Sequence, residues 1–475
     1  MAATPQRRRV LVVSNDVVGR SMAGPGIRYY HFARELARHH EVTLAVPQPV
    51  DIELDGIQTV VWRGLRTPEL KRLCEGFDAL VAQQLPPRVM RHLARTRVRA
   101  VYDLYDPYLL ENLGFYAARE RGDGVERLEH RSGGLLQEIA LATGDAFVCA
   151  SERQRDLWLG MLGVLDRIDL DRYAGDEQLR GLVDVVPFGL DPEPPRAAAG
   201  ALKGVVPGIA AGDRVLLWGG GVWNWLDPLT PIRAVGRLAE RRDDVKLYFL
   251  GLRHPNPDVA EMAMAQRAVD LAQELGLRDR HVFFNFGWVP YAERHGYLLD
   301  ADLGVSAHLD TVEARFAFRT RIVDYFWAGL PVVATRGDAL AELVEERGLG
   351  RALEFGDVDG WAAAIEGLLD DAEAHARARA ELARVREQFA WPRLVERLAA
   401  LVEAPPGRRA PRRADALVLR HLWLYGRMFQ RRAGTRSVLE HAALAVLIKA
   451  GLVDPSPGAR SRWRLGGRRP PDGRR

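Results

Sequence analysis

The chain has 475 residues, of which 47% are hydrophobic and 27% charged, so it is long enough for two or three globular domains. Two cysteines exclude a disulfide framework, and no apolar run approaches the roughly 18 residues that a membrane-spanning helix requires. The net charge of +4 is unevenly spread, because residues 406–475 hold 17 Lys and Arg against 4 Asp and Glu. We therefore expect a cytoplasmic protein with an acidic body and a basic tail.

The first part of the chain alternates short apolar runs with helical patterns. Val10-Leu-Val-Val13 predicts a buried strand, and Gly24-Pro-Gly26 opens a helix with an apolar stripe. With a strand at 42–46 they form a β-α-β unit whose glycine turn offers backbone amides at the strand's carboxyl end. Further strands are predicted at 79–82, 100–102, 146–150 and 183–186. This alternation predicts a parallel sheet covered on both faces, in a first domain over residues 1–190.

A proline-rich run from Pro187 to Pro195 interrupts this alternation and predicts a linker over residues 191–212. A second series follows, with strands predicted at 214–218, 246–250, 281–284, 303–306 and 331–335, and helices, kinked at Trp391-Pro392, that close a domain over residues 213–404. Ligands of such sheets bind at the carboxyl ends of the strands. The predicted fold is therefore α/β, with two Rossmann-like domains facing a cleft.

The stretch from Glu313 to Asp338 predicts a loop, a helix over 319–328, a stop at Gly329 and Pro331, and a buried strand. Arg319 and Arg321 fall in the first helical turn, where the helix dipole is already positive. That placement indicates a phosphate or diphosphate held between the two guanidinium groups, while Asp324 could accept hydrogen bonds from ribose hydroxyls. The alternative is a solvated helix face with Arg321 paired to Asp324.

Residues 405–475 form a basic extension, with helices predicted at 414–429 and 437–450 and no regular structure over 456–475. Such a tail can dock on anionic lipid, which would place the protein at the inner face of the cell membrane. A packed helical appendix is the alternative. Nucleic acid is not an expected partner, because the tail has no interleaved aromatic platform.

From about Val10 to Val402 the chain resembles GT-B glycosyltransferases of the retaining, nucleotide-sugar-dependent family 4 type. The residues that carry the resemblance are Asp324-Tyr-Phe-Trp-Ala-Gly-Leu-Pro-Val-Val, Val186-Pro-Phe-Gly-Leu-Asp191, Phe286-Gly-Trp-Val-Pro290 and Ala390-Trp391. The resemblance implies transfer of a sugar from a nucleotide diphosphate sugar to a hydroxyl acceptor. It places the donor in the second domain and the acceptor, such as a glycan, lipid-linked or cell-surface polysaccharide precursor, against the first.

Four positions depart from the family's pattern. The first of its two glutamates falls on Phe316, with Glu313 nearby as a replacement. The two basic elements that hold the donor diphosphate are absent from Gly219-Gly-Gly-Val-Trp-Asn-Trp225, and the N-domain histidine reads as Tyr102-Asp103. Because Arg319 and Arg321 stand where that family has uncharged residues, we infer that they supply the missing charge.

The residues and the resemblance together predict the following site. Donor binding is expected for Gly219, Gly220, Gly221, Asn224, Trp288, Val289, Glu313, Arg319, Thr320, Arg321 and Asp324, with Gly24, Gly26 and Arg28 in an N-domain loop. Catalytic roles are expected for Arg319 and Arg321 at the leaving phosphate, and for Asp103 or Asp106 at the acceptor. The sequence shows neither an Asp-X-Asp pattern nor a His and Cys ligand cluster, so we expect no essential metal and no cofactor besides the donor. A non-catalytic GT-B scaffold that binds a nucleotide or a partner protein is the main alternative, and an epimerase or phosphorylase of the same architecture is another.

Overall fold

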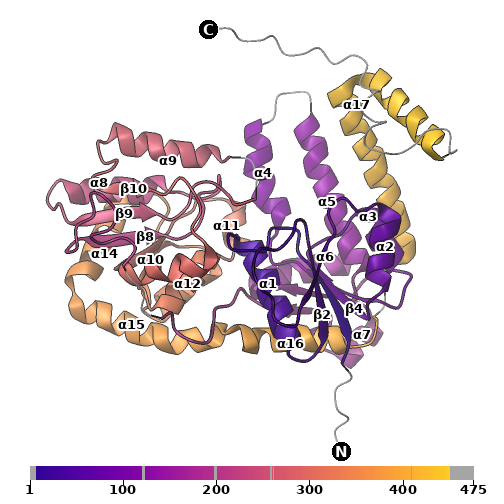
Figure 1. Ribbon diagram of the computed structural model, residues 1–475, viewed down its shortest axis with the longest axis horizontal. Helices are drawn as coiled ribbons and strands as arrows, with labels where there is room; N and C mark the ends of the chain where they lie inside the picture. Colours follow the sequence, from indigo (N-terminus) through magenta and orange to yellow (C-terminus); the bar gives the residue numbers. More distant parts are fainter. Residues whose placement is uncertain are drawn as a thin grey trace, which may run out of the picture.

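The computed structural model describes residues 7–119, 124–196, 200–256, 259, 261–407 and 409–449. Two parallel sheets with helices on their faces lie side by side in Figure 1, which confirms the expected α/β fold with two Rossmann-like units. Within these residues no helix combines the length and the apolar character needed to cross a membrane.

The first sheet has seven strands in the order β3-β2-β1-β4-β5-β6-β7, and Val10 of β1 pairs with both Val42 and Ala79. Its strands are β1 (Arg9–Val13), β2 (Glu41–Val46), β3 (Gln58–Val61), β4 (Ala79–Ala82), β5 (Arg99–Asp103), β6 (Ala146–Cys149) and β7 (Val183–Val185). The helices are α1 (Gly24–Leu36), α2 (Thr67–Glu75), α3 (Pro87–Leu93), α4 (Tyr108–Arg119), α5 (Val125–Thr143), α6 (Glu152–Val164) and α7 (Leu170–Gly175). The predicted strands are confirmed. The edge strand β3 was not predicted, because three of its four residues are exposed and it has no buried apolar run.

The second sheet has six strands in the order β10-β9-β8-β11-β12-β13. Its strands are β8 (Arg214–Trp218), β9 (Val245–Phe249), β10 (Val282–Phe284), β11 (Leu303–Ser306), β12 (Val332–Thr335) and β13 (Gly350–Leu353). The helices are α8 (Leu229–Ala239), α9 (Ala263–Glu274), η1 (Tyr291–Glu293), α10 (Arg294–Asp300), α11 (Val312–Phe316), α12 (Thr320–Ala328), α13 (Ala339–Glu346) and α14 (Val358–Asp370). The five predicted strands are confirmed, and β13 is an additional edge strand that lacks an apolar run.

After the second sheet the chain returns to the first. Helix α15 (Ala372–Arg386) and the short turn η2 (Glu387–Phe389) lead into α16 (Trp391–Glu403), which runs along the bottom of Figure 1 beneath the first sheet. Trp391 and Leu398 of α16 are fully buried in the core of the first sheet. The kink expected between helical segments at Trp391-Pro392 is a break between two helices: α16 begins at Trp391, and Pro392 lies in its first turn, where it needs no backbone N–H.

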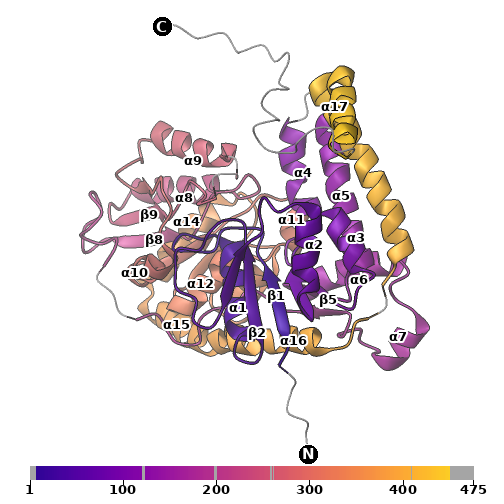
Figure 2. The same ribbon diagram turned by 45° about the vertical axis from the view of Figure 1, so that its right-hand side comes forward.

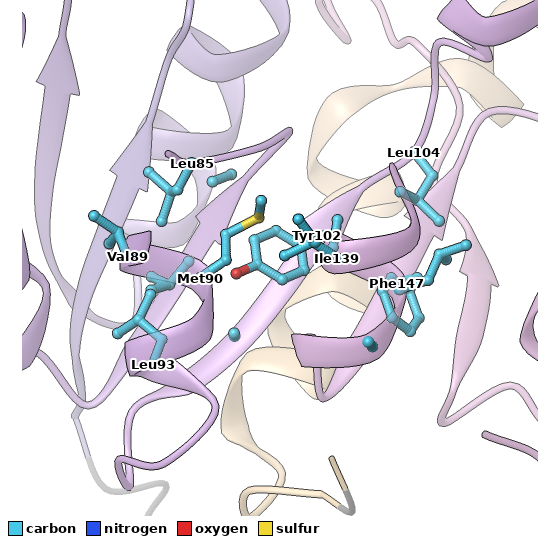
Figure 3. Close-up of a cluster of buried hydrophobic side chains, with 14 of the residues drawn as sticks. Leu85, Val89, Met90, Leu93, Tyr102, Leu104, Ile139 and Phe147 are labelled. Atoms are coloured by element: carbon cyan, nitrogen blue, oxygen red, sulfur yellow. The ribbon is translucent and has the colours of Figure 1, made fainter. Parts of the chain in front are cut away.

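The last helix, α17 (Pro411–Lys449), packs along α5 and α3. It replaces the two helices that were predicted, and residues 456–475 lie outside the described part of the chain. Its Leu417, Val418 and Leu424 belong to the cluster of buried side chains that fills the space between α3, α5 and the first sheet. Figure 3 shows part of this cluster, with Met90, Tyr102 and Ile139 pointing toward one another. The first half of the extension is therefore part of the first domain's core.

Candidate active site

A cleft of about 760 Å³ lies between the two sheets. It is lined by the loops that follow β1, β4, β5, β8, β9 and β10, together with the N-termini of α1 and α12. Both sheets thus present the carboxyl ends of their strands to the same space, as the sequence predicted. The cleft is large enough for a ligand of nucleotide-sugar size.

A glycine loop at the end of β8 forms the floor of the cleft on the second domain's side. Gly219, Gly220 and Gly221 line the cavity, and Gly220 has a φ of 79°, a left-handed conformation that favours glycine. The loop is held by Tyr325 of α12, whose hydroxyl accepts the backbone N–H of Gly219 at 2.8 Å. The same hydroxyl lies 2.8 Å from the backbone oxygen of Val305 and 2.9 Å from that of Leu217. Tyr325 therefore fixes the glycine loop to the ends of β8 and β11.

Helix α12 begins at Thr320 and ends at Gly329, which has the expected left-handed conformation with a φ of 65°. Arg321, in its first turn, donates to the backbone oxygen of Gly221 at 2.8 Å and lies over the Trp218 ring at 4.5 Å. Burial, with a smaller contribution from Arg319, lowers the pKa of Arg321 to about 10, so the guanidinium remains charged at neutral pH. Its Nη1 is buried without a hydrogen-bond partner among the described residues. A lining cation with an unused donor is a site for an anion.

Arg319 is placed differently from Arg321. Its two Nη atoms donate to the two carboxylate oxygens of Glu313, at 3.0 and 2.7 Å, and both side chains are buried. The charge of Arg319 is therefore compensated by Glu313, although both residues line the cleft. Phe316, at the position of the family's first glutamate, is not among the described residues that line the cleft. The carboxylate of Glu313 therefore lines the cleft, whereas the side chain of Phe316 does not.

Asp324 lies one turn further along α12 and lines the cleft. Its carboxylate is 3.3 Å from Nε of Arg294, whose guanidinium is stacked on Tyr291 and Trp327. Burial raises the pKa of Asp324, and the positive charge of Arg294 offsets part of this effect. The alternative pairing of Arg321 with Asp324 does not occur, because Arg294 holds Asp324 and Arg321 contacts the glycine loop.

Aromatic side chains form the end of the cleft near β9 and β10. Trp288 and Val289 line it as predicted, and the rings of Trp223 and Trp225 are stacked at 5.5 Å. The first domain reaches this end through the loop after β1. The indole N–H of Trp288 donates to the backbone oxygen of Met22 at 3.2 Å. The two domains are therefore in direct contact at the aromatic end.

On the first domain's side, a pair of carboxyl groups lines the cleft, and the ion pair of Arg28 with Asp103 is buried behind it. Asp103 has no exposed surface, and Arg28 donates to both of its carboxylate oxygens at 2.6 and 2.9 Å. Neither residue lines the cleft, so this pair joins α1 to β5 and does not face an acceptor. Three residues further on, Asp106 does line the cleft, beside Glu111 of α4. Of the two predicted acceptor-side carboxylates, only Asp106 is in contact with the cavity.

The carboxyl groups of Asp106 and Glu111 are close enough to affect each other's pKa. Burial raises the pKa of both groups, and the charge of Asp106 raises that of Glu111 further, well above its ordinary value. Two carboxyl groups in contact cannot both ionise without repulsion. The pair therefore retains a proton at a pH at which an isolated carboxyl group would have lost it.

The raised pKa of Glu111 gives a testable pH dependence of stability. A carboxyl group whose pKa is higher in the folded state stabilises the fold fully below its unfolded value, near 4.5, and loses this contribution as the pH rises through the folded value. Glu111→Gln keeps a hydrogen-bond donor and removes the titration. We expect its melting temperature to match the wild type at pH 4.5 and to exceed it at pH 8. Glu240→Gln, at an exposed carboxylate, is the control, and parallel wild-type and Glu111→Gln profiles would contradict the proton-sharing pair.

The predicted site residues divide into two groups. Those that the structure brings together around the cleft are Gly24, Asp106, Gly219, Gly220, Gly221, Trp288, Val289, Glu313, Arg319, Thr320, Arg321 and Asp324. Those that do not line it are Gly26, Arg28, Asp103 and Asn224. Gly26 allows a close approach to the Val17 backbone, and Asn224 accepts the backbone N–H of Met264.

Sequence reasoning missed Glu111, Arg294 and Tyr325, together with the tryptophans of the Trp223-Asn-Trp225 run. Only the Trp-Asn-Trp run carried a local signal, because two tryptophans lie within four residues after three consecutive glycines. The other three are recognisable only from the contacts that the fold brings about.

The chain is similar in sequence to one glycosyltransferase family and in structure to several solved proteins. Residues 213–371 match the family described as "Glycosyl transferases group 1". No curated protein matches the sequence. Among solved structures, Anabaena Alr3699/HepE in complex with UDP-glucose is similar with a TM-score of 0.58 and 14% identity, covering 83% of this chain and 99% of that one. Sucrose-phosphate synthase from Thermosynechococcus elongatus has a TM-score of 0.56 and 17% identity, covering 83% and 98%. WaaG, a glycosyltransferase involved in lipopolysaccharide biosynthesis, has a TM-score of 0.56 and 15% identity, covering 83% and 99%.

Proposed function

We propose that this chain, which has the GT-B fold and whose residues 213–371 match the group 1 glycosyltransferase family, transfers a sugar from a nucleotide diphosphate sugar to a hydroxyl acceptor. The observation that carries the proposal is the anion site at the start of α12. Three features line one cleft there: the N-terminus of the helix, the glycine loop after β8, and Nη1 of Arg321. This Nη1 has no hydrogen-bond partner among the described residues. A diphosphate matches this combination of donors and positive charge.

The proposed roles follow from the contacts. Departure of the nucleoside diphosphate places negative charge on its terminal phosphate, and Arg321 with the backbone amides of Gly219–Gly221 would stabilise that charge. Arg321 is held by Gly221 and Trp218 before any ligand arrives, so little reorganisation is required. Arg319 belongs to the same wall of the cleft and supports it through its ion pair with Glu313. Asp324 would bind the ribose. The backbone and the ring at Trp288-Val289 would bind the base.

On the acceptor side the proposal assigns Asp106 and Glu111 to the acceptor hydroxyl. Both line the cleft from the first domain, whereas Arg321 lines it from the second. A carboxylate that accepts the hydroxyl hydrogen bond orients the oxygen for attack on the sugar. Asp103 takes no part, because Arg28 neutralises it in the core.

Two finer points are part of the proposal. The stereochemical outcome is retention, by resemblance to family 4 enzymes. The reaction is proposed to need no metal ion, because Arg321 can supply positive charge at the phosphate. The acceptor is a cell-surface polysaccharide or lipid-linked precursor presented at an anionic membrane surface, which agrees with the +13 charge of residues 406–475.

The proposal predicts donor selectivity and turnover that can be measured directly. A panel of nucleoside diphosphates and their sugars, tested by thermal shift, should single out one base, with UDP first to test because HepE was crystallised with UDP-glucose. The selected sugar should be hydrolysed slowly without acceptor, at a rate unchanged by EDTA, and the released sugar's anomeric configuration read by NMR should be retained. Binding without any turnover would support the second candidate, a non-catalytic nucleotide-binding scaffold, which the buried Asp103 and the Phe316 position favour.

A further inference from the structure

The outer face of α17 combines exposed apolar and basic side chains. Positions 412, 416, 419, 420, 423 and 427 recur every three or four residues and therefore share one side of the helix. Leu419 and Trp423 on this side are 66% and 60% exposed. Arg412, Arg420 and Arg427 are exposed around them, and the guanidinium of Arg427 lies 5.3 Å from the Trp423 ring. We call Arg412, Leu419, Arg420, Trp423 and Arg427 the outer face.

This exposure does not reflect a loosely attached helix. The opposite side of α17 is buried against α5 and α3 through Ala414, Leu417, Val418 and Leu424. His421 lies 3.3 Å from the Ser132 hydroxyl of α5, and Arg91 and Arg95 pair with Asp415 near the start of the helix. The outer face is thus held in a fixed orientation on the first domain.

We propose that the outer face docks on an anionic membrane surface. Tryptophan is preferred at the boundary between headgroups and acyl chains, and leucine beside it can enter the same layer. The described side chains of α17, residues 411–431, include five arginines and one acidic residue, Asp415, which is already paired. A surface that is both basic and apolar fits anionic lipid better than nucleic acid, where stacking aromatics would lie along a groove.

Docking through the outer face would hold the first domain, to which the proposed function assigns the acceptor, at the membrane surface. Helix α4, which contributes Glu111 and Phe115 to the cleft, packs against α5, and α5 packs against α17. Figures 1 and 2 show α4, α5 and α17 projecting side by side from the same end of the molecule. The outer face is on the side of α17 that points away from α5, so α5 and α4 lie between this face and the cleft.

The test is sedimentation of the full-length protein with vesicles of phosphatidylcholine alone or with 30% phosphatidylglycerol. We expect binding to the anionic vesicles only, weakened by 0.5 M salt because the arginine charges are screened. Arg420→Gln with Arg427→Gln should reduce the partition coefficient at least about tenfold, since each basic residue near the surface contributes roughly a fivefold factor. Leu419→Ala with Trp423→Ala should reduce it by a similar factor.

Matched controls exist elsewhere on the chain. Leu170 and Tyr173 of α7 are 85% and 52% exposed, so Leu170→Ala with Tyr173→Ala removes similar apolar surface. Arg233→Gln with Arg267→Gln removes two exposed charges from the second domain. Both control variants should bind vesicles like the wild type. Wild-type binding by the two outer-face variants would overturn the proposal.

Two further measurements separate the outcomes. A concentration-dependent dimer in size-exclusion chromatography that the Leu419→Ala, Trp423→Ala variant abolishes would assign the face to a second copy and overturn membrane docking. Hydrolysis of the donor in solution should be the same in the wild type and the outer-face variants, because none of these residues lines the cleft. Vesicle binding without donor hydrolysis would support docking and refute the proposed function, and the reverse result would do the opposite.

Discussion

Arg321→Ala should weaken binding of the preferred nucleoside diphosphate by at least about 30-fold, equivalent to about 2 kcal/mol. The reason is that Arg321 lines the cleft without a carboxylate partner among the residues that the structure describes, whereas Arg319 is paired with Glu313. Isothermal titration calorimetry measures the change in affinity. Without ligand, the variant should lose only about 1–2 kcal/mol of folding stability, because one hydrogen bond to the Gly221 backbone and the cation–π contact with Trp218 disappear.

The matched control is Arg315→Ala, which removes an exposed arginine from the neighbouring helix α11 and should bind normally. Arg321→Lys keeps the charge but loses the planar guanidinium, so its affinity should lie between those of the wild type and Arg321→Ala. If Arg321→Ala binds the nucleotide as tightly as Arg315→Ala, the diphosphate does not lie at the start of α12.

The second large effect concerns folding stability and the segment that joins α16 to α17. Arg409 of this segment donates to both carboxylate oxygens of Asp145 and to the backbone oxygens of Leu93, Thr96 and Val98. The side chains of Arg409 and Asp145 are 5% and 0% exposed. Arg409→Ala leaves a buried charge without its partner, so we expect the free energy of unfolding of the first domain to fall by about 3–5 kcal/mol.

Urea denaturation followed by circular dichroism measures this loss, with exposed Arg412→Ala as the control. The double variant Arg409→Gln with Asp145→Asn removes both charges and should recover part of the lost stability, as expected for residues whose effects are coupled. An unfolding free energy within about 0.5 kcal/mol of the wild type for Arg409→Ala would mean that the segment does not anchor α17.

The central strands of both sheets were predictable because each is a short, continuous apolar run between helical patterns. The edge strands β3 and β13 were not, because one side of an edge strand faces solvent and its residues carry no apolar signal. The length of α17 was also missed, whereas its packing against α5 agrees with the packed helical appendix that was the alternative to lipid docking. The sequence did not indicate how this extension is anchored, because Arg409 is bound by Asp145, more than 260 positions earlier.

For the site, the sequence indicated the segment from Glu313 to Asp338, but it did not indicate which residues its side chains contact. Arg319 and Arg321 were indistinguishable by their positions in the sequence. In the structure the charge of Arg319 is compensated by Glu313, whereas Arg321 contacts Gly221, 100 positions away. Asp103 and Asp106 were likewise equivalent candidates by sequence. They differ in the structure, because Arg28 forms an ion pair with Asp103. Such pairings are decided by side-chain directions after folding, which local patterns do not contain.

The return of the chain through α16 has a consequence for the order in which the protein forms on the ribosome. Trp391 and Leu398 complete the hydrophobic core of the first sheet, and Leu417 and Val418 complete its other side. The second sheet with its helices, in contrast, is continuous from β8 to α14. The domain that is translated first therefore cannot close until almost the whole chain has emerged, and the domain translated second can finish folding before it.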